Sequence, residues 1–273
     1  MNKSKTKDGF HFQRFGENRS LILETTVAAS WRHNQPCLME LDVTKAREAI
    51  HRIRREKAEG ISFLSWLMTC IGKACSEYPQ VHAWRYGARK TVTFDDVDIG
   101  TYVERKVGGV SIPVPMVIRK TNAKSSEEIF KEIHSAQTQT VDTEGHFLGS
   151  DDGADRIARI SRRLPRFLRM LIWRRLMHDG FMAKRIIGTV GVTAMGMVAR
   201  GTAWPIPSGL RTLSFAVGPL SRKPAFIKDK VVPREFLCLT AVFDHDIVDG
   251  LPAARFLARL AKLIEGAYGL EKL

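Results

Sequence analysis

The chain is poor in cysteine, with four in 273 residues, and none of them forms a Cys-x-x-Cys pair. This scarcity argues against a fold held together by disulfides, because such chains carry cysteines at high density. No cluster of histidines lies beside the cysteines, so the pattern does not indicate a metal site. We interpret Cys37, Cys70, Cys75 and Cys238 as reduced thiols, as is typical of a cytoplasmic protein.

Long apolar runs are missing as well. None approaches the ~20 residues that a membrane-spanning helix needs. The basic start of the chain (Lys3, Lys5, Lys7) is not followed by the apolar segment of a signal peptide. No internal repeat, low-complexity tract or linker divides the chain. With 44% apolar and 26% charged residues, the sequence predicts one globular α/β domain, cytoplasmic and without a transmembrane segment.

Acidic residues are few relative to basic ones, 29 against 43, which gives a formal charge of +14. The excess is uneven, because residues 155–187 hold ten Lys and Arg against two Asp, a local charge of +8. A basic balance of this size indicates an anionic partner. Nucleic acid, a membrane surface and a phosphorylated small molecule all fit the composition.

The spacing of apolar residues predicts the elements of the domain. The first 20 residues are polar and are predicted to form an arm, followed by a short strand over 21–27. Prolines at 113 and 115 predict that the strand over 110–118 is either an edge strand or an irregular one. Pro165 is expected to kink or split a helix over 156–172. The other predicted strands are 37–43, 91–97, 99–103, 188–195, 212–217, 225–227 and 236–243, with a hairpin turn at 228–230, and the other predicted helices are 44–58, 62–76, 125–136, 173–184 and 252–265.

One segment has the pattern of a catalytic loop. An apolar strand ends at Asp244-His245-Asp246, and Asp249-Gly250 follow just before the last helix. Catalytic side chains are often found in loops at the ends of strands, because the scaffold holds them in place. The spacing taken alone favours an ordinary polar turn with one histidine. The residues on both sides of this segment favour the catalytic interpretation instead.

Those flanking residues resemble a known signature. The run LTAVFDHDIVDGLPAARFL (239–257) is similar to S-x-D-H-R-x-x-D-G-A-x-A-A-R-F-L, which ends the catalytic domain of the acyltransferases of 2-oxo acid dehydrogenase complexes. Chloramphenicol acetyltransferase shares the shorter H-x-x-x-D-G motif. The resemblance covers residues 31–137 and 188–270, and its upstream parts are ELDV (40–43), FDDVDIG (94–100), VSIPVPMVIR (110–119), the helix 125–133 and GTVGVTAMG (188–196).

The resemblance implies a chloramphenicol acetyltransferase-like α/β fold, a two-layer sandwich with a mixed sheet and helices packed on it. It implies an acyltransferase in which His245 is the general base that takes a proton from the thiol of coenzyme A or dihydrolipoamide. Thr193 stands where the family has the serine that donates to the oxyanion. Asp249 stands where an aspartate fixes the active-site loop, through an ion pair. The resemblance also implies homotrimers, or larger cages of trimers, with His245 and Thr193 supplied by neighbouring subunits.

Some residues depart from the family pattern. Asp246 replaces an arginine beside the histidine, and we expect it either to act on the charge of the histidine or to pair with a nearby arginine. Ala194 replaces the usual Asn or Ser, and Pro36-Cys37 replaces a Pro-His pair. Residues 1–30 alone precede the resemblance, so no covalently attached lipoyl group is expected. Acyl-CoA is the expected substrate, with a separate lipoyl or carrier domain as a further partner.

Residues 138–187 have no counterpart in the resemblance and are predicted to form a basic helical insertion. The simplest interpretation is a helical pair packed on the domain with a solvated basic face. The alternatives are a docking face for an acidic carrier domain, a wall of the coenzyme A channel, or an interfacial membrane helix. Nucleic acid is not expected as a partner, because no basic-aromatic recognition module is present. The arginines of this segment are Arg156, Arg159, Arg162, Arg163, Arg166, Arg169, Arg174, Arg175 and Arg185.

The sequence thus predicts an N-terminal arm over 1–30 and an acyltransferase catalytic domain over 31–273. Two other functions stay open. The first is a stand-alone acyltransferase of the same fold that acts on a small alcohol or amine. The second is a non-catalytic assembly protein, against which the joint presence of His245, Thr193 and Asp249 argues.

Overall fold

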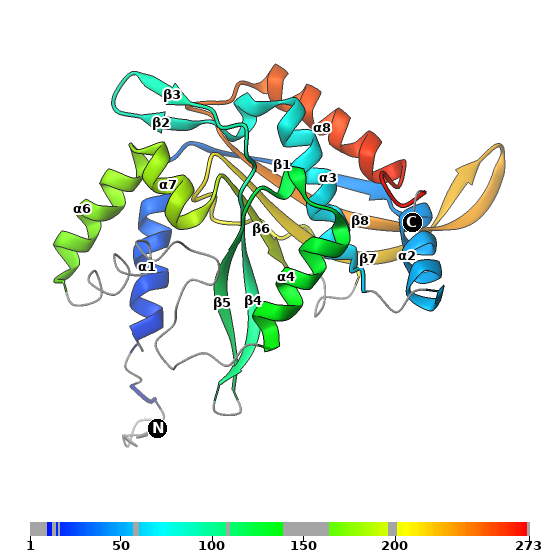
Figure 1. Ribbon diagram of the computed structural model, residues 1–273, viewed down its shortest axis with the longest axis horizontal. Helices are drawn as coiled ribbons and strands as arrows, with labels where there is room; N and C mark the ends of the chain where they lie inside the picture. Colours follow the sequence, from blue (N-terminus) through cyan, green and yellow to red (C-terminus); the bar gives the residue numbers. More distant parts are fainter. Residues whose placement is uncertain are drawn as a thin grey trace.

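In the computed structural model, which describes residues 10–12, 15, 17–56, 60–107, 110–138, 164–195 and 201–271, a six-stranded mixed sheet forms the centre of the molecule (Figure 1). Its strand order is β1-β8-β7-β6-β4-β5. β6 runs parallel to β4 and β7, and the other neighbours are antiparallel. The bounds are β1 (Asn34–Asp42), β4 (Ile99–Val107), β5 (Val110–Ile118), β6 (Val190–Ala194), β7 (Leu213–Ile227) and β8 (Lys230–Asp244).

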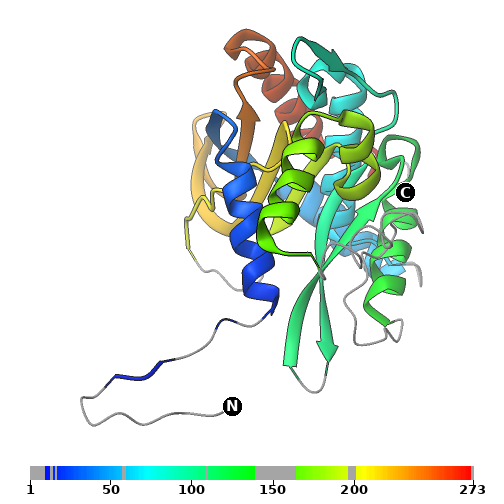
Figure 2. The same cartoon turned by 90° about the vertical axis from the view of Figure 1, so that its left-hand side faces the viewer.

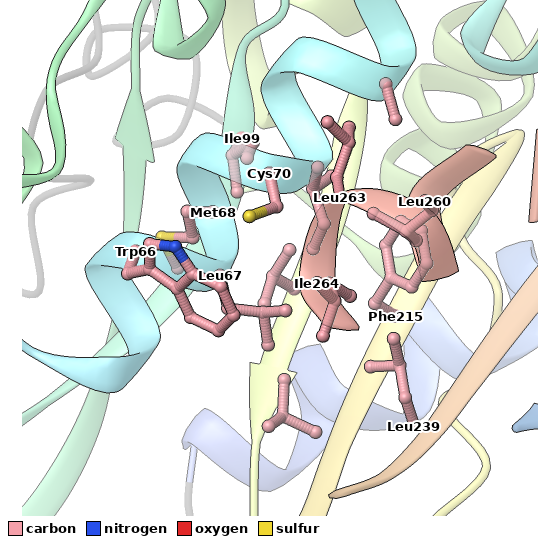
Figure 3. Packing of buried hydrophobic residues seen from close by; sticks show 14 of the residues in the cluster. Trp66, Leu67, Met68, Cys70, Ile99, Phe215, Leu239, Leu260, Leu263 and Ile264 are labelled. Carbon is pink, nitrogen blue, oxygen red and sulfur yellow. The ribbon is translucent and has the colours of Figure 1, made fainter. Parts of the chain in front are cut away.

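Four helices cover one face of this sheet and enclose the main core with it: α2 (Thr44–Glu56), α3 (Phe63–Glu77), α4 (Ser126–Thr138) and α8 (Gly250–Glu265). The central helix α3 is apolar nearly all round, and residues on most of its sides are buried, as the sequence predicts. Figure 3 shows this packing: Trp66 and Leu67 of α3 lie on one side of Ile264 of α8, and Phe215 of β7 lies on the other side, next to Leu260. The predicted layer of helices on a mixed sheet is therefore present.

Serine residues start two of these helices. The Ser62 side chain accepts a hydrogen bond from the Ser65 amide at 2.9 Å at the start of α3. At the start of α4, the Ser125 amide donates to the Glu128 carboxylate at 2.7 Å, and the Glu128 amide donates to the Ser125 hydroxyl at 3.2 Å. This reciprocal pair is the capping box that the Ser-x-x-Glu spacing predicts.

β5 lies at an edge of the sheet, as its prolines predict. Pro113 pairs with Glu104 and Pro115 with Tyr102 of β4, its one neighbour in the described sheet. Proline has no N–H to donate, so a strand with two prolines is compatible with an edge position and not with a central one. The strand nevertheless keeps a regular register along its whole length.

A small hairpin and two short 3₁₀ helices complete this part of the chain: β2 (Trp84–Tyr86), β3 (Lys90–Val92), η1 (Pro79–His82) and η2 (Thr121–Ala123). The strand predicted over 91–97 is therefore shorter than expected. Its second half is a loop, because the Asn122 side chain accepts from the Val97 amide at 2.9 Å and donates to the Asp95 carbonyl at 3.0 Å. A side chain thus replaces the neighbouring strand as partner of this backbone.

β7 and β8 form one long hairpin of two 15-residue strands, which projects beyond the helices (Figure 1). The segments predicted separately over 212–217 and 225–227 are two parts of β7. The predicted turn is confirmed: Lys228 and Asp229 connect the strands, with φ angles of 47° and 62°. Both residues lie in the left-handed region, as a type I′ hairpin turn requires.

Substituting this turn is expected to stabilise the protein. Lys228→Asn and Asp229→Gly together replace two residues strained at positive φ by the pair that this turn type prefers. We expect the free energy of unfolding to rise by about 1 kcal/mol, since relief of left-handed strain has this size. Urea denaturation measures the change. A decrease in stability would show that the turn differs from type I′ in solution.

The N-terminal segment differs from its prediction. Residues 21–27, predicted as a strand, belong to helix α1 (Glu17–Ala29), so this part of the predicted arm is a docked helix. Glu24 is buried and accepts three hydrogen bonds, of 2.6 to 3.0 Å, from the guanidinium of Arg169. Such a long-range pair has no local signature, and it outweighs the β-branched composition of the segment.

Helix α6 (Arg166–Met177) lies beside α1, and helix α7 (Gly180–Ile187) follows it (Figure 2). Pro165 is the N-cap residue of α6, so this helix begins directly after the proline. The predicted helical part over 156–163 lies outside the described residues. The helix predicted over 173–184 is instead divided at Asp179, whose side chain accepts from the Met182 amide at 3.1 Å and caps α7. The apolar sides of both helices pack on Trp84 of β2, so the described part of the insertion is a helical pair docked on the domain.

Candidate active site

The loop between β8 and α8 carries the predicted catalytic histidine. β8 ends at Asp244, and α8 begins at Gly250. His245 is exposed, and its backbone amide donates to the His33 carbonyl at 2.9 Å. This bond continues the pairing of β1 with β8 by one residue, so the histidine backbone is fixed while its side chain remains accessible.

Asp244, directly before the histidine, forms a buried ion pair with Arg32. The Arg32 guanidinium lies over the Trp84 ring, 4.6 Å from its centroid. Burial lowers the pKa of Arg32, and the adjacent Asp244 carboxylate acts against this effect. A buried pair of this kind holds the base of the loop strongly, because separating the partners would leave an uncompensated charge away from water.

Asp246, directly after the histidine, is held from two sides. His33 Nδ1 lies 2.7 Å from one of its carboxylate oxygens, and Arg85 NH2 lies 3.4 Å from the other. Of the two roles expected for Asp246, pairing with a nearby arginine is therefore confirmed. Both carboxylates that flank His245 are thus bound to basic side chains from distant segments.

Asp249 stands at the N-cap position of α8 and is exposed. Within the described part of the chain its carboxylate forms no ion pair, so its expected role in fixing the loop stays a prediction. The ion pair observed at this loop is that of Asp244, five residues earlier. Asp244 lies inside the molecule beside Arg32, whereas Asp249 is exposed.

Thr193 lies on β6, half-buried and remote from His245 within one chain. The register places Thr193 beside Ala216 of β7, which in turn pairs with Thr240 of β8. At ~3.3 Å per residue, the five residues from Thr240 to His245 span about 16 Å along the strand. One subunit therefore does not bring the two predicted catalytic side chains together.

Sequence reasoning missed the three residues that hold the flanking carboxylates: Arg32, His33 and Arg85. Arg32 and His33 directly precede β1, whose Asn34 pairs with Asp244. Knowledge of this strand pairing would have placed them at the loop, because the next residues of each strand must then meet. Arg85 lies on β2, which pairs with β3 and not with β1 or β8, so no strand pairing predicts its place at the loop.

The profile of the 2-oxoacid dehydrogenases acyltransferase family (catalytic domain) matches residues 26–147 and 187–270, which is most of the chain. The chain belongs to this family. The family, the fold class and the acyltransferase activity predicted from the C-terminal motif are thereby confirmed. The matched ranges leave out residues 148–186, which lie within the segment interpreted as an insertion.

Solved structures share the acyltransferase fold at low sequence identity. A probable dihydrolipoamide acetyltransferase from Listeria monocytogenes aligns with a TM-score of 0.67 and 17% identity, over 97% of both chains. The cubic core of a pyruvate dehydrogenase multienzyme complex gives a TM-score of 0.65 and 18% identity, over 97% of this chain and 96% of that one. A truncated catalytic core from Thermoplasma acidophilum gives 0.63 and 18%, over 94% and 98%. No curated protein sequence matches the chain.

The described residues of this acyltransferase lack two further kinds of feature. None of their helices has the length and apolar character needed to cross a membrane. They also contain no group of three or more His, Cys, Asp or Glu side chains placed to hold a metal ion.

All four cysteines are free, and burial raises the pKa of the Cys70 and Cys75 thiols. Buried, protonated thiols of this kind are poor nucleophiles.

A cleft of about 400 Å³ opens beside the loop that carries His245. Its floor includes both carboxylates that flank His245, and one wall comes from α6, outside the ranges that match the family. The cleft is lined by Trp31, Arg32, Arg85, Arg174, Met177, His178, Asp244 and Asp246.

Proposed function

We propose that the chain transfers an acyl group between coenzyme A and a thiol such as dihydrolipoamide, with His245 as general base. The observation that carries this proposal is the way in which the backbone around His245 is held. The residue directly follows β8 inside the matched range, and the carboxylates on both sides of it, Asp244 and Asp246, are bound to basic side chains. An exposed imidazole on a fixed backbone is suited to meet a substrate thiol.

The proposed reaction runs through a tetrahedral intermediate. His245 takes the proton of the attacking thiol, and the thiolate adds to the carbonyl carbon of the acyl thioester. The oxyanion then accepts a hydrogen bond from the Thr193 hydroxyl. Collapse of the intermediate breaks the original carbon–sulfur bond, and the leaving thiolate recovers the proton from the imidazolium. Asp249, at the N-cap position of α8, marks the end of the loop that carries the base.

The separation of His245 and Thr193 within one chain supports a site shared by two subunits. We propose a homotrimer, alone or as part of a larger cage, in which each site combines His245 of one subunit with Thr193 of its neighbour. Such a head-to-tail interface closes into a ring under threefold symmetry. One structural relative is described as a cubic core, which is consistent with trimers as building blocks.

Mixing two inactive variants tests the shared site. Thr193→Val is expected to lower kcat ~10²- to 10³-fold, the usual effect of losing one oxyanion donor. After denaturation and joint refolding with His245→Ala in equal amounts, about a quarter of the sites of a ring would hold one intact copy of each residue. Activity should recover to about that fraction of wild type, whereas either variant refolded alone stays inactive.

Thr193→Ser is the matched control for this experiment, because it keeps the hydroxyl and should keep most of the activity. Native mass spectrometry verifies that both variants share the same oligomers. Mixed oligomers without recovered activity would contradict a site formed between subunits.

The reaction itself is tested by release of free coenzyme A from a panel of acyl-CoA thioesters. The acceptors are free dihydrolipoamide, a separate lipoyl domain, a small alcohol and a small amine. Transfer to dihydrolipoamide or to the lipoyl domain supports the proposal. Transfer to the alcohol or amine alone would assign the chain to the stand-alone reaction, and no transfer in any combination would favour an assembly role.

A further inference from the structure

The cleft beside the catalytic loop contains one positive charge without a partner. Asp244 is paired with Arg32, and Asp246 with Arg85 and His33. Arg174, the third arginine of the lining, is exposed and has no acidic partner among the described residues. The cleft therefore carries an excess of one positive charge, contributed by helix α6.

Arg32 has unused hydrogen-bonding capacity in the same lining. Its Nε and NH2 nitrogens are buried and have no acceptor in the described part of the chain, and only NH1 binds Asp244. Because both nitrogens are buried, a ligand in the cleft cannot reach them, and Arg32 contributes its charge to the site without a direct contact. The lining thus combines an exposed guanidinium on α6, that of Arg174, with a buried one that is bound to Asp244.

The other properties of the cleft restrict the ligand. Its volume of about 400 Å³ suits a small molecule and not a protein surface. Trp31 and Met177 provide apolar contact area. A phosphate monoester, with nearly two negative charges, would be repelled by Asp244 and Asp246, whereas a single carboxylate matches the excess charge and the fork of a guanidinium.

From these observations we propose that the cleft binds the carboxylate of a small organic substrate, with Arg174 as the residue that recognises it. The proposal rests on the proposed acyl transfer. The cleft is lined by Asp244 and Asp246, the residues directly before and after His245, so a ligand bound there would lie beside the general base. The carboxylate belongs either to the far end of the acyl group or to the acceptor. Arg174, Met177 and His178 lie outside the ranges that match the family, so the family match by itself does not account for this wall.

Direct binding separates the site from catalysis. The probes for isothermal titration are monomethyl glutarate, which has one carboxylate, its neutral analogue dimethyl glutarate, and inorganic phosphate. We expect the full-length protein to bind the monoester about tenfold or more tightly than the diester, as a charge-assisted hydrogen bond provides. Arg174→Gln should abolish this preference, and salt should weaken it, because Arg174 is exposed.

Arg166→Gln is the matched control, since it removes the same exposed charge from the first turn of α6, away from the cleft. It should keep the preference for the monoester. Arg174→Lys keeps the charge but loses the two parallel hydrogen bonds that a guanidinium can donate to a carboxylate. It replaces Arg174→Gln if that variant fails to fold, and it should reduce the preference for the monoester. Equal affinity for both esters, a preference that survives in Arg174→Gln, or tighter Arg174-dependent binding of phosphate would each overturn the proposal.

Turnover identifies which substrate carries the carboxylate. Glutaryl-CoA is compared with pentanoyl-CoA as donor, and 3-mercaptopropionate with 2-mercaptoethanol as acceptor. A preference for the acidic member of one pair, lost in Arg174→Gln and kept in Arg166→Gln, assigns the carboxylate to that substrate. If neither pair shows a preference during active transfer, the substrate role is wrong. If no thioester is used but the monoester binds as expected, the acyl transfer fails and the anion site stands.

Discussion

Replacement of His245 by alanine is expected to reduce kcat for acyl transfer by ~10²- to 10⁴-fold, the usual contribution of a positioned general base. The fold should not change, because the side chain is exposed and the loop is held by the backbone bond to His33 and by the ion pairs of Asp244 and Asp246. The measurement is the initial rate of coenzyme A release with the best donor and acceptor from the substrate panel, at saturating concentrations of both.

His51→Ala is the control for this experiment, since His51 is an exposed histidine on α2. Its activity should equal that of the wild type. Circular dichroism and thermal melting of both variants establish that the fold is retained. A His245→Ala protein that still turns over at a rate near wild type would remove the general base from the proposed mechanism.

Substitution of Asp244 by asparagine is expected to be the most destabilising single change in the loop. The variant keeps the shape of the side chain but leaves the buried Arg32 guanidinium without its counter-charge. Breaking a buried pair in this way costs about 3–5 kcal/mol. Urea denaturation at a fixed protein concentration measures the loss, because an oligomer gains stability with concentration.

Two further variants show whether the buried charge causes the effect. Glu77→Gln breaks the exposed pair with Arg259 and should cost less than about 1 kcal/mol. Arg32→Met combined with Asp244→Leu removes both charges and should recover much of the stability that Asp244→Asn loses. A loss below about 1 kcal/mol for Asp244→Asn would mean that the pair is open to water in solution.

The parts of the fold that the sequence predicts are those with local physical causes. Helix α4 starts at a Ser-x-x-Glu box, β5 is placed at the edge by its prolines, and helix α3 is buried because it is apolar on nearly every side. In the site, the C-terminal motif was sufficient to locate His245 at the end of a strand. Each of these signals acts over a few residues, so a single sequence contains it in full.

The parts that the sequence does not predict depend on contacts between distant segments. Helix α1 is held by Glu24 and Arg169, which lie 145 residues apart in the sequence. The base of the loop is held by Arg32 and Asp244, which lie 212 residues apart in the sequence. Sequence patterns reflect neighbouring residues only, so they predict a strand over 21–27 and do not reveal the partner of Asp244.

The bond between Glu24 and Arg169 has a consequence for how the protein is shortened. The range that matches the family begins at residue 26, inside α1 and just after Glu24. A fragment trimmed to that boundary would lose the carboxylate but keep Arg169, at the helix that supplies Arg174 to the cleft. Such a fragment would retain every residue proposed for acyl transfer and yet loosen the wall beside them. The smallest fragment that preserves the arrangement described here therefore begins before Glu17, ahead of the range that the family profile matches.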